Sequence, residues 1–576
     1  MKIAALIFIS FAAFITAVAF RFGIQNNNKQ PVAQIVAEQK KFSIRCSPIY
    51  VPAAGDDIPL LTGWGNYSWK ITTASDSAQV YFNQGINMYY GFHIIEAMAS
   101  FKKATKFDPG CAMLHWAQAL AYGPNINDFG YTASYNAYLA SGKAIEFCGP
   151  CTEKEQLLIR AQRSRYSGDS AENREKLNQD YVDAMKEAYE EFPNDADVAA
   201  LYADAMMLQH PWDLWNINGT PKPWTPLIRE VLEKLLTKFP NHPGANHYYI
   251  HVMEPSPFAA KALPSANRLG KISPGLSHLV HMPSHIFLRT GKYQKGVDVN
   301  INAVNSYKKS IPLYAPVTGA DFLYIIHNLH MKTNNAMLLG NYKISETAAN
   351  ETRNSVPGDY LSTPPPMGSY LQYIHMTPLL VYIRFGKWDE LLQMQQPDAS
   401  LVYSNVLYHL GRGVAFSYKQ NFNEAARELD LMRELMKDSS LFVPFNPFSA
   451  AIEGAKVGEQ LLLGVIHEQR KLYDGAIRHF KQADSIEANM VYNEPRDWLL
   501  NPKHYLGNAY LENGDGVNAE KKFKKDLRYN NENGWALFGL YKALLLQKKN
   551  AEAAKVLGRF KIAFSNADIK ITSSVF

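Results

Sequence analysis

Cysteine and unbalanced charge are both scarce in this chain. It has 4 cysteines in 576 residues, and its formal net charge is only +6. No run of five or more Lys and Arg residues occurs. Proteins that bind nucleic acids usually carry a basic patch or stripe, so the composition argues against a nucleic-acid partner. Apolar residues at 47% and charged residues at 19% instead indicate a globular chain rather than a disordered one.

The sequence also lacks the motifs of several common enzyme classes. It contains no Gly-rich phosphate loop, no Gly-x-Ser-x-Gly elbow and no EF-hand loop. Its acidic residues are dispersed, so no carboxylate pair for glycoside chemistry can be named. A convincing strand pattern is missing too, because apolar residues recur at spacings of three and four rather than two. We therefore expect an all-α protein, and the motifs leave open whether it is an enzyme.

Two of the cysteines stand close together, in Cys148-Gly149-Pro150-Cys151. This is the spacing of a thioredoxin-type redox motif, which lies between a strand and a helix. Here both flanks predict helices, and Thr152 with Glu155 forms the capping-box pattern that starts the second one. We therefore expect a local disulfide in a helix–helix turn rather than a redox site.

A long hydrophobic run occurs only at the N-terminus. Residues 3–20 carry no charge, follow Met1-Lys2, and end near Ala17-Val18-Ala19, which fits a signal-peptide cleavage site. At about 1.5 Å per residue, the same run could cross a bilayer as an uncleaved anchor. We expect residues 1–20 to be a signal peptide or a single N-terminal membrane anchor, and residues 21–45 to be a tether. The protein would then be exported, either periplasmic or anchored in the inner membrane and facing the periplasm.

One turn pattern recurs along the rest of the chain. Large apolar residues precede a short turn, and a helix with small residues near its start follows it. The pattern occurs at Gly91-Phe92, Gly291-Lys292-Tyr293, Gly340-Asn341-Tyr342, Gly386-Lys387-Trp388, Asn421-Phe422, Lys471-Leu472-Tyr473, Asn518-Ala519 and Asn550-Ala551. Such turns are typical of tetratricopeptide (TPR) repeats, in which helix pairs stack because one pair cannot bury its apolar face alone.

The repeats are degenerate, since Gly291 and Gly340 are 49 residues apart against a TPR period of about 34. We predict an all-α, TPR-like helical-hairpin solenoid, or superhelix. Its expected parts are N-terminal repeats over residues 46–240, central His-rich repeats over residues 241–400, and C-terminal repeats over residues 401–576.

Histidine is concentrated in the central part, where eight of the 16 histidines lie between His242 and His330. Three pairs have helical spacing: His247 with His251, His281 with His285, and His327 with His330. Residues three or four apart on a helix lie on one face, about 5–6 Å apart at Cβ. Each pair precedes its own turn, so we expect the three pairs on the concave first helices of three neighbouring repeats.

Imidazole is a common ligand of zinc, copper and iron. These six histidines therefore predict a transition-metal site, with Glu254, His278 and His375 as secondary candidates. No Cys or Met cluster accompanies them, which argues against a thiol-rich copper(I) site. Pro283 lies between His281 and His285 and would either kink the helix or mark its first turn.

Two other interpretations of the histidines stay open. They could form a layer of hydrogen-bonded side chains that only shapes a polar groove, with Tyr248, Tyr249 and Tyr324 among the partners. They could also line a groove for an anionic or peptide ligand. The loop from Pro211 to Pro226, rich in Trp, Pro and Gly, is expected to pack or to cover that groove.

The chain resembles a family of exported bacterial TPR-repeat proteins whose activity is generally unassigned. The resemblance covers nearly the whole mature chain and depends on long blocks. Among them are Asn241-His242-Pro243-Gly244-Ala245-Asn246-His247-Tyr248-Tyr249-Ile250-His251, His278-Leu279-Val280-His281-Met282-Pro283-Ser284-His285-Ile286, His327-Asn328-Leu329-His330 and Tyr492-Asn493-Glu494-Pro495-Arg496-Asp497-Trp498. It implies a TPR-like fold and carries over no reaction. The family commonly has Gly-Phe-Asn-His where this chain has Gly91-Phe92-His93-Ile94.

Two functions follow as hypotheses. By analogy of fold, the first is a binding or scaffold protein whose concave groove holds a peptide, a protein or a small ligand. The second is a metal-binding protein or metal-dependent enzyme that uses the six paired histidines with zinc, copper or iron.

Overall fold

The computed structural model describes residues 58–127, 135–169, 173–310, 322–445, 448–494 and 498–576. All of these belong to one unit of the chain, residues 43–576. The predicted leader (1–20), the tether (21–45) and Cys46 lie outside the described residues. Within the described ranges, no helix is both long and apolar enough to cross a membrane.

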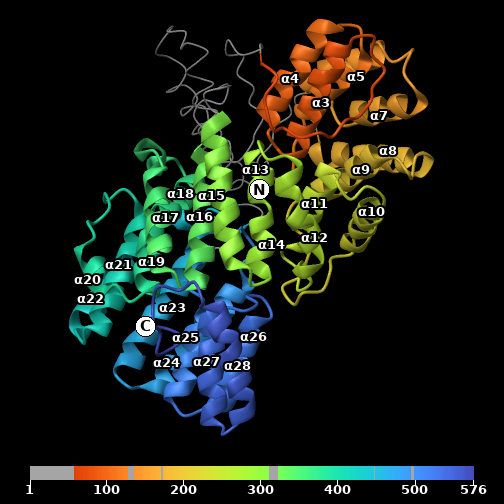
Figure 1. Ribbon diagram of the computed structural model, residues 1–576. Helices are drawn as coiled ribbons and strands as arrows, with labels where there is room; N and C mark the ends of the chain where they lie inside the picture. Colours follow the sequence, from red (N-terminus) through yellow and green to blue (C-terminus); the bar gives the residue numbers. More distant parts are fainter. Residues whose placement is uncertain (1–57, 128–134, 170–172, 311–321, 446–447, 495–497) are drawn as a thin grey trace, which may run out of the picture. The chain divides into compact units, whose positions relative to one another are not determined.

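The fold is built from short helices that follow one another along the chain (Figure 1). The first half contains α3 (Asp76–Tyr90), α4 (Ile94–Phe107), α5 (Ala112–Ala121), α6 (Tyr135–Glu146), α7 (Glu153–Ser164), α8 (Arg174–Glu191), α9 (Ala196–Gln209), α10 (Thr225–Lys238), α11 (Pro243–Met253), α12 (Leu263–Ile272), α13 (Ser277–His281), α14 (Pro283–Arg289) and α15 (Tyr293–Ser310). The second half contains α16 (Phe322–Leu339), α17 (Tyr342–Asn354), α18 (Met367–His375), α19 (Thr377–Arg384), α20 (Trp388–Gln393), α21 (Val402–Tyr418), α22 (Phe422–Leu435), α23 (Ala451–Gln469), α24 (Tyr473–Asn489), α25 (Pro502–Glu512), α26 (Gly516–Leu527), α27 (Gly534–Leu546) and α28 (Asn550–Ala563).

Within the described ranges, three short 3₁₀ helices complete the regular structure: η1 (Ala259–Ala262), η2 (Gly358–Ser362) and η3 (Ser439–Phe442). In the part of the chain that the structure describes, the only β-type pairing is an isolated bridge between Trp215 and Pro221. The prediction of an all-α fold is therefore confirmed.

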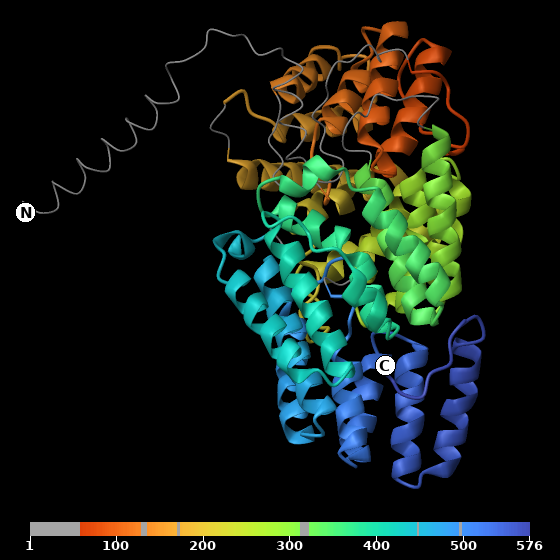
Figure 2. The ribbon, with the colours of Figure 1, turned by 90° about the vertical axis from the view of Figure 1, so that its left-hand side faces the viewer.

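Successive helices pack against each other as hairpins. Figure 2 shows this most plainly for α25 to α28, which stand side by side at the C-terminal end. Most of the predicted turns fall between paired helices, although Asn518-Ala519 lies within α26, and several turns require a left-handed backbone. Gly291 (φ 73°), Gly340 (φ 75°) and Gly386 (φ 66°) provide it between α14 and α15, α16 and α17, and α19 and α20. The TPR-like helical-hairpin solenoid predicted from these turns is confirmed.

The predicted capping box before α7 is also present. The Thr152 side chain accepts a hydrogen bond from the Glu155 backbone N–H, and the Glu155 carboxylate accepts one from the Thr152 N–H. Cys148 and Cys151 lie in the turn that precedes this helix, but both are free thiols. The expected local disulfide is therefore not formed.

A small residue allows α15 and α16 to approach closely. A Cβ atom at Gly296 would lie 2.1 Å from Asn335 Oδ1 on α16, a distance that no real side chain could keep. Gly296 is the crossing-point residue that the repeat pattern predicts. The close packing matters because α16 carries His327, and α15 carries Asn300, a partner of His281.

Two large clusters of buried apolar residues and one small cluster form the interior of the described part of the chain. The first runs from Trp69 to Phe287, which is on α14. The second includes Leu323 and Ile326 of α16 and continues to Val575. The Trp535 Nε1–H donates to the Met337 carbonyl at 2.9 Å, which ties α27 to α16. The histidines of the central repeats are therefore contributed by helices of both clusters.

Candidate metal centre

The first group of histidines is formed by α11 and α13. His247 and His251 lie one turn apart on α11, and their Nε2 atoms are 3.1 Å from each other. His278 on α13 brings its Nε2 atom to 3.1 Å from His247 Nε2. The three ligand atoms lie close enough together to hold one metal ion. We call these residues the first triad.

The second group is formed by α13, α14 and α16. His281 and His285 place their Nε2 atoms 2.8 Å apart. His327 of α16 faces the same point, with its ring centroid 4.6 Å from that of His281. These three residues also satisfy the geometry for one metal ion, and we call them the second triad.

The nitrogen atoms on the outer side of the rings have partners that determine the tautomers. His247 Nδ1 lies 2.6 Å from the Tyr90 carbonyl oxygen, which can only accept a hydrogen bond. His281 Nδ1 lies 2.6 Å from Asn300 Oδ1, and the Asn300 amide is oriented because its Nδ2 donates to the Gly296 carbonyl at 2.7 Å. In both rings Nδ1 therefore carries the hydrogen and Nε2 carries a lone pair.

Two buried carboxylates lie between the triads. Glu254, the residue after α11, has Oε1 3.1 Å from His251 Nδ1 and Oε2 2.8 Å from His285 Nδ1. Glu494 lies 3.3 Å from His251 Nδ1 through Oε1, and 3.6 Å from His327 Nε2 through Oε2. His251 and the two carboxylates form a third group that could hold an ion. Carboxylates on the outer nitrogen of ligating histidines orient the rings and raise their basicity.

In the first triad, His247 Nε2 carries a lone pair toward His251, whose raised pKa gives its Nε2 a hydrogen to donate across the 3.1 Å contact. In the second triad, His281 Nδ1 faces Asn300 and His285 Nδ1 lies 2.8 Å from Glu254 Oε2, so the two Nε2 lone pairs face each other at 2.8 Å. Such contacts are repulsive unless a cation lies among the nitrogen atoms. With metal–nitrogen bonds of about 2.0–2.1 Å, a tetrahedral ion would separate two ligand nitrogens by about 3.3 Å. The observed 2.8–3.1 Å separations are close to that value.

Burial lowers the pKa of three of the six triad histidines. Burial and the neighbouring His251 hold the pKa of His247 well below its usual value, and burial with neighbouring histidines does the same to the pKa of His278. Burial and His285 lower the pKa of His281 to about 3. Burial alone would lower the pKa of His251, but hydrogen bonds with Glu254 and Glu494 raise it to about 9. Neutral imidazole is the form that binds metals, and burial keeps His247, His278 and His281 in it.

The structure regroups the histidines that the sequence pairs. His247, His251, His281, His285 and His327 all enter the triads, and Glu254 lies between them. His278, a secondary candidate, completes the first triad.

Two predicted residues lie outside the triads. His330 points toward Tyr373, with the ring centroids 5.9 Å apart and the planes nearly perpendicular. His375 ends α18, where burial and the nearby Arg353 lower its pKa to about 4.

Sequence reasoning missed Glu494 as a site residue. It belongs to the segment after α24, 243 positions from His251, and no helical spacing connects it to the histidines. One signal for it is present in the sequence: Glu494 belongs to the block beginning Tyr492-Asn493-Glu494, on which the resemblance to the TPR-repeat family partly depends. Tyr492 is missed as well, and its hydroxyl donates to Glu254 Oε2 at 2.9 Å.

The triads are enclosed rather than open to a groove. Their six side chains are 0–7% exposed. Phe92 packs on the first triad, with its ring centroid 4.4 Å from that of His247. Trp212, from the predicted Trp-rich loop, stands edge-on to His251 at 5.5 Å. We expected these histidines to line a concave groove, and this expectation was wrong because aromatic residues from distant segments cover them.

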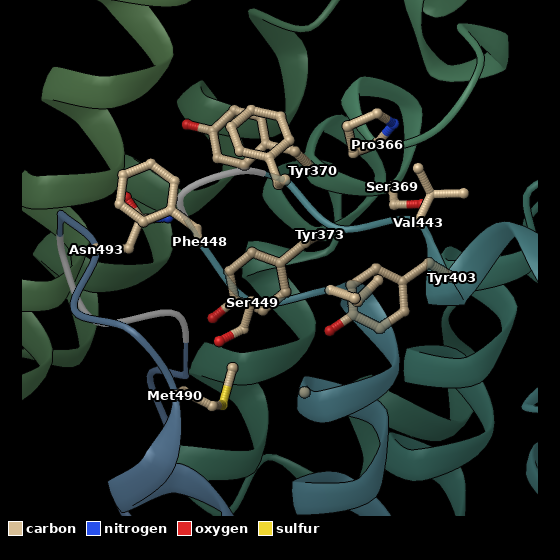
Figure 3. A pocket seen from close by; sticks show the side chains of 14 residues that line it. Pro366, Ser369, Tyr370, Tyr373, Tyr403, Val443, Phe448, Ser449, Met490 and Asn493 are labelled. Atoms are coloured by element: carbon tan, nitrogen blue, oxygen red, sulfur yellow. The ribbon is translucent and has the colours of Figure 1, made fainter. Parts of the chain in front are cut away.

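Two cavities adjoin the site. One of about 270 Å³ is lined partly by Trp212, Pro255 and Tyr492. The other, of about 60 Å³, is shown in Figure 3, where Tyr370, Tyr373 and Phe448 present their rings to it. Met490 lines both cavities, so the segment from Met490 to Glu494 contributes to both cavities and to the metal site.

Comparison with known proteins gives similarity of fold only. No protein-family model matches the chain, and no curated protein matches it. A human IFIT1 dimer with m7Gppp-AAAA is similar over 87% of this chain and 92% of that chain, with 13% identity and a TM-score of 0.31. Yeast Tom70 is similar over 84% and 93%, with 12% identity and a TM-score of 0.28. The Cut9–Hcn1 hetero-tetramer of APC/C is similar over 85% and 78%, with 12% identity and a TM-score of 0.29. These values are too low to bear on function.

Proposed function

We propose that this protein is a metalloprotein in which the two histidine triads each hold one transition-metal ion. The observation that carries the proposal is the convergence of six buried imidazoles on two points, with the Nε2 lone pairs of His281 and His285 directed at each other at 2.8 Å. A layer of histidines that served only to satisfy hydrogen bonds would instead alternate donors and acceptors.

The donor set restricts the metal. Imidazole and carboxylate ligands suit zinc, copper(II) and iron, whereas soft copper(I) favours thiols and thioethers. The described cysteines, at positions 111, 148 and 151, lie on or beside α5 to α7 and contribute to neither triad. Zinc, copper and iron are therefore the ions to test.

The carboxylates give the site its charge balance. Two divalent ions held by six neutral imidazoles would bring four positive charges into the protein interior, and burial of unpaired charge is costly. Glu254 and Glu494 supply two negative charges within 4.0 Å of these rings. Paired metal ions in proteins serve as Lewis acids, as activators of water, or as redox centres.

Elemental analysis of full-length protein purified without a histidine tag or chelator tests the proposal. About two ions of zinc, copper or iron per chain are expected. The double variant His281→Ala/His285→Ala should lose at least half of this metal, whereas His375→Ala, outside the triads, should keep all of it. Failure to retain any of the three metals after incubation and desalting would overturn the proposal.

Partner binding and export, which the sequence predicts, are also proposed. Binding of a peptide or protein in a concave groove rests on the TPR-like fold, since repeat arrays present extended surfaces to partners. Export, to the periplasm or to an inner-membrane anchor, rests on residues 1–20. N-terminal sequencing of the mature protein tests export, because cleavage near Ala19 would leave a chain that begins close to Phe20.

A further inference from the structure

The two buried carboxylates of the metal centre contact its histidines in different ways. Glu254 reaches His251 Nδ1 at 3.1 Å through Oε1, and it reaches His285 Nδ1 at 2.8 Å through Oε2. Both distances lie in the range of hydrogen bonds from a ring N–H to a carboxylate. The Tyr492 hydroxyl also donates to Oε2, at 2.9 Å. Glu254 therefore accepts hydrogen bonds on the side of the rings that faces away from the metal.

Glu494 approaches the second triad from the inside. Its Oε2 atom lies 3.6 Å from His327 Nε2 and 4.0 Å from His285 Nε2. The Nδ1 atom of His285 carries its hydrogen toward Glu254, so the Nε2 atom of that ring presents a lone pair. One oxygen of Glu494 is therefore close to the point on which the nitrogen atoms of the second triad converge.

The two separations are too long for hydrogen bonds and suit two ligands of one ion. A hydrogen bond to a carboxylate spans about 2.7–3.2 Å, and a contact of 3.6 Å is not one. Metal–nitrogen and metal–oxygen bonds of about 2.0–2.2 Å place ligand atoms about 3.3–3.6 Å apart at tetrahedral angles. Wider angles between ligands lengthen that separation further. The contacts of Glu494 Oε2 at 3.6 Å and 4.0 Å therefore fit a shared ion.

Burial supports the same conclusion through charge. The Glu494 side chain is only 1% exposed. An ionised carboxylate in the interior is costly unless it is paired or coordinates a metal. Its Oε1 atom has His251 Nδ1 at 3.3 Å, whereas its Oε2 atom faces the lone pair of His285 Nε2. A cation between Oε2 and the imidazoles turns this repulsion into attraction.

The chain positions Glu494 through the segment that follows α24. Tyr492 and Glu494 are two residues apart in this segment, and both side chains reach the metal centre. The Glu494 backbone N–H donates to Asn493 Oδ1 at 2.8 Å, and Asn493 is itself buried. The carboxylate is therefore held in place by contacts of its own segment.

We propose that Glu494 is a direct ligand, through Oε2, of the ion in the second triad, which is then held by three imidazoles and one carboxylate. The inference rests on the proposed metal-binding function. The first triad differs, because both carboxylates face the outer nitrogen of its His251. The two ions therefore have different ligand sets, and the mixed nitrogen and oxygen donors of the second site suit zinc or iron.

Cobalt(II) bound to full-length protein in the His278→Gln background tests the proposal, because the first triad then lacks a ligand and the remaining ion reports on the second. Visible absorption of cobalt reports its ligands, and competition with a chelator measures its affinity. Glu494→Gln keeps the size of the side chain but removes its charge. It should change the spectrum and weaken binding by more than about 100-fold, beyond the range of about 10–100-fold that is usual for losing a hydrogen-bond partner of a ligand.

Two variants serve as comparisons. Glu254→Gln should weaken cobalt binding by about 10–100-fold and leave the spectrum close to that of the parent, because Glu254 contacts only outer nitrogen atoms. Glu468→Gln makes the same change at a buried carboxyl group of α23 and should alter neither the spectrum nor the affinity.

Wild-type protein provides a second readout that does not depend on the folding of any variant. The infrared difference spectrum between metal-free and metal-loaded protein should contain the carboxylate stretching bands of a metal-bound glutamate. These bands should disappear in Glu494→Gln and persist in Glu254→Gln. A wild-type spectrum without them would overturn the assignment of Glu494.

The outcomes separate this inference from the proposed function. Wild-type protein that retains no metal overturns the metalloprotein and this ligand with it. Wild-type protein that binds two ions, while Glu494→Gln and Glu254→Gln have equal affinity and the same spectrum, overturns the assignment of Glu494 alone. In that case Glu494 acts like Glu254, as a hydrogen-bond partner of the ligands.

Discussion

His281 and His285 hold their Nε2 atoms 2.8 Å apart across a break between two helices. α13 ends at His281, and α14 begins at Pro283. Proline is tolerated at the first position of a helix because its missing N–H would have no partner there. Met282 keeps helical angles (φ −49°, ψ −36°), so the one-turn spacing of the two histidines survives the break. Pro283 therefore marks a first turn and does not separate the pair.

The two triads should lose metal independently. His278→Gln removes one ligand from the first triad and should lower the metal content by about one ion per chain, while the second triad stays occupied. His330→Gln, on the helix that also carries His327, should keep the full content because His330 packs on Tyr373 instead. Elemental analysis after dialysis measures both variants. Equal metal loss in the two would show that the triads are not the sites.

Asn300, which accepts a hydrogen bond from His281, should control the metal affinity of the second triad. Asn300→Leu removes the acceptor that orients the His281 ring and should weaken metal binding by about 10–100-fold, the usual effect of losing such a partner. Asn300→Asp keeps an acceptor oxygen at the same place and should retain most of the affinity. Competition with a chelator of known affinity measures the difference. If Asn300→Asp is as weak as Asn300→Leu, the hydrogen bond to His281 is not what matters.

Close packing of α15 on α16 should make Gly296 sensitive to a single methyl group. Gly296→Ala places a Cβ 2.1 Å from Asn335 Oδ1 and should lower the free energy of unfolding by about 1–3 kcal/mol through overpacking. Gly558→Ala is the matched control, since nothing lies within 4 Å of its Cβ on α28. There alanine should raise stability by about 0.5–1 kcal/mol, because glycine is a poorer helix former. Urea unfolding should show a lower free energy of unfolding for Gly296→Ala and a higher one for Gly558→Ala than for the wild type.

A carboxyl group far from the metal centre should make stability depend on pH. Glu468 on α23 is buried, and burial raises its pKa from 4.5 to about 7, even though Asn508 donates to it at 3.0 Å. The folded state thus holds a proton that the unfolded state releases near pH 4.5. The stabilisation is fully present below pH 4.5 and is lost as the pH rises through about 7.

Glu468→Gln isolates this contribution. Glutamine is neutral at every pH and still offers an oxygen to Asn508. The free energy of unfolding of the wild type, relative to that of the variant, should fall by up to about 3 kcal/mol between pH 4.5 and pH 8. Chemical unfolding at several pH values measures the difference. A constant difference would mean that Glu468 titrates normally in the folded protein.

Local sequence pattern accounts for most of the fold. The turns at Gly291, Gly340 and Gly386 were recognisable because only glycine adopts their left-handed backbone without strain. The small residue at Gly296 was recognisable for a related reason, since two helices can cross closely only where a side chain is missing. These features depend on a few neighbouring residues, which a sequence displays directly.

The composition of the site depended on contacts that no local pattern encodes. Helical spacing identified His247 with His251 and His281 with His285, because both pairs lie within one helical turn. It also paired His327 with His330, although helix α16 directs His327 to the second triad and His330 to Tyr373. Which face of a helix meets the site is decided by packing against other helices.

The sequence by itself determined the helical hairpins, their turns and the concentration of histidines, because each follows from the conformations that neighbouring residues allow. Only the tertiary structure decided that the histidines form two triads, that Glu494 joins them from 243 positions beyond His251, and that Phe92 and Trp212 enclose them. The reason is physical. Burial and the convergence of ligands arise when segments that are far apart in the sequence pack together, and the number of residues between two segments does not say how close they lie in the folded protein.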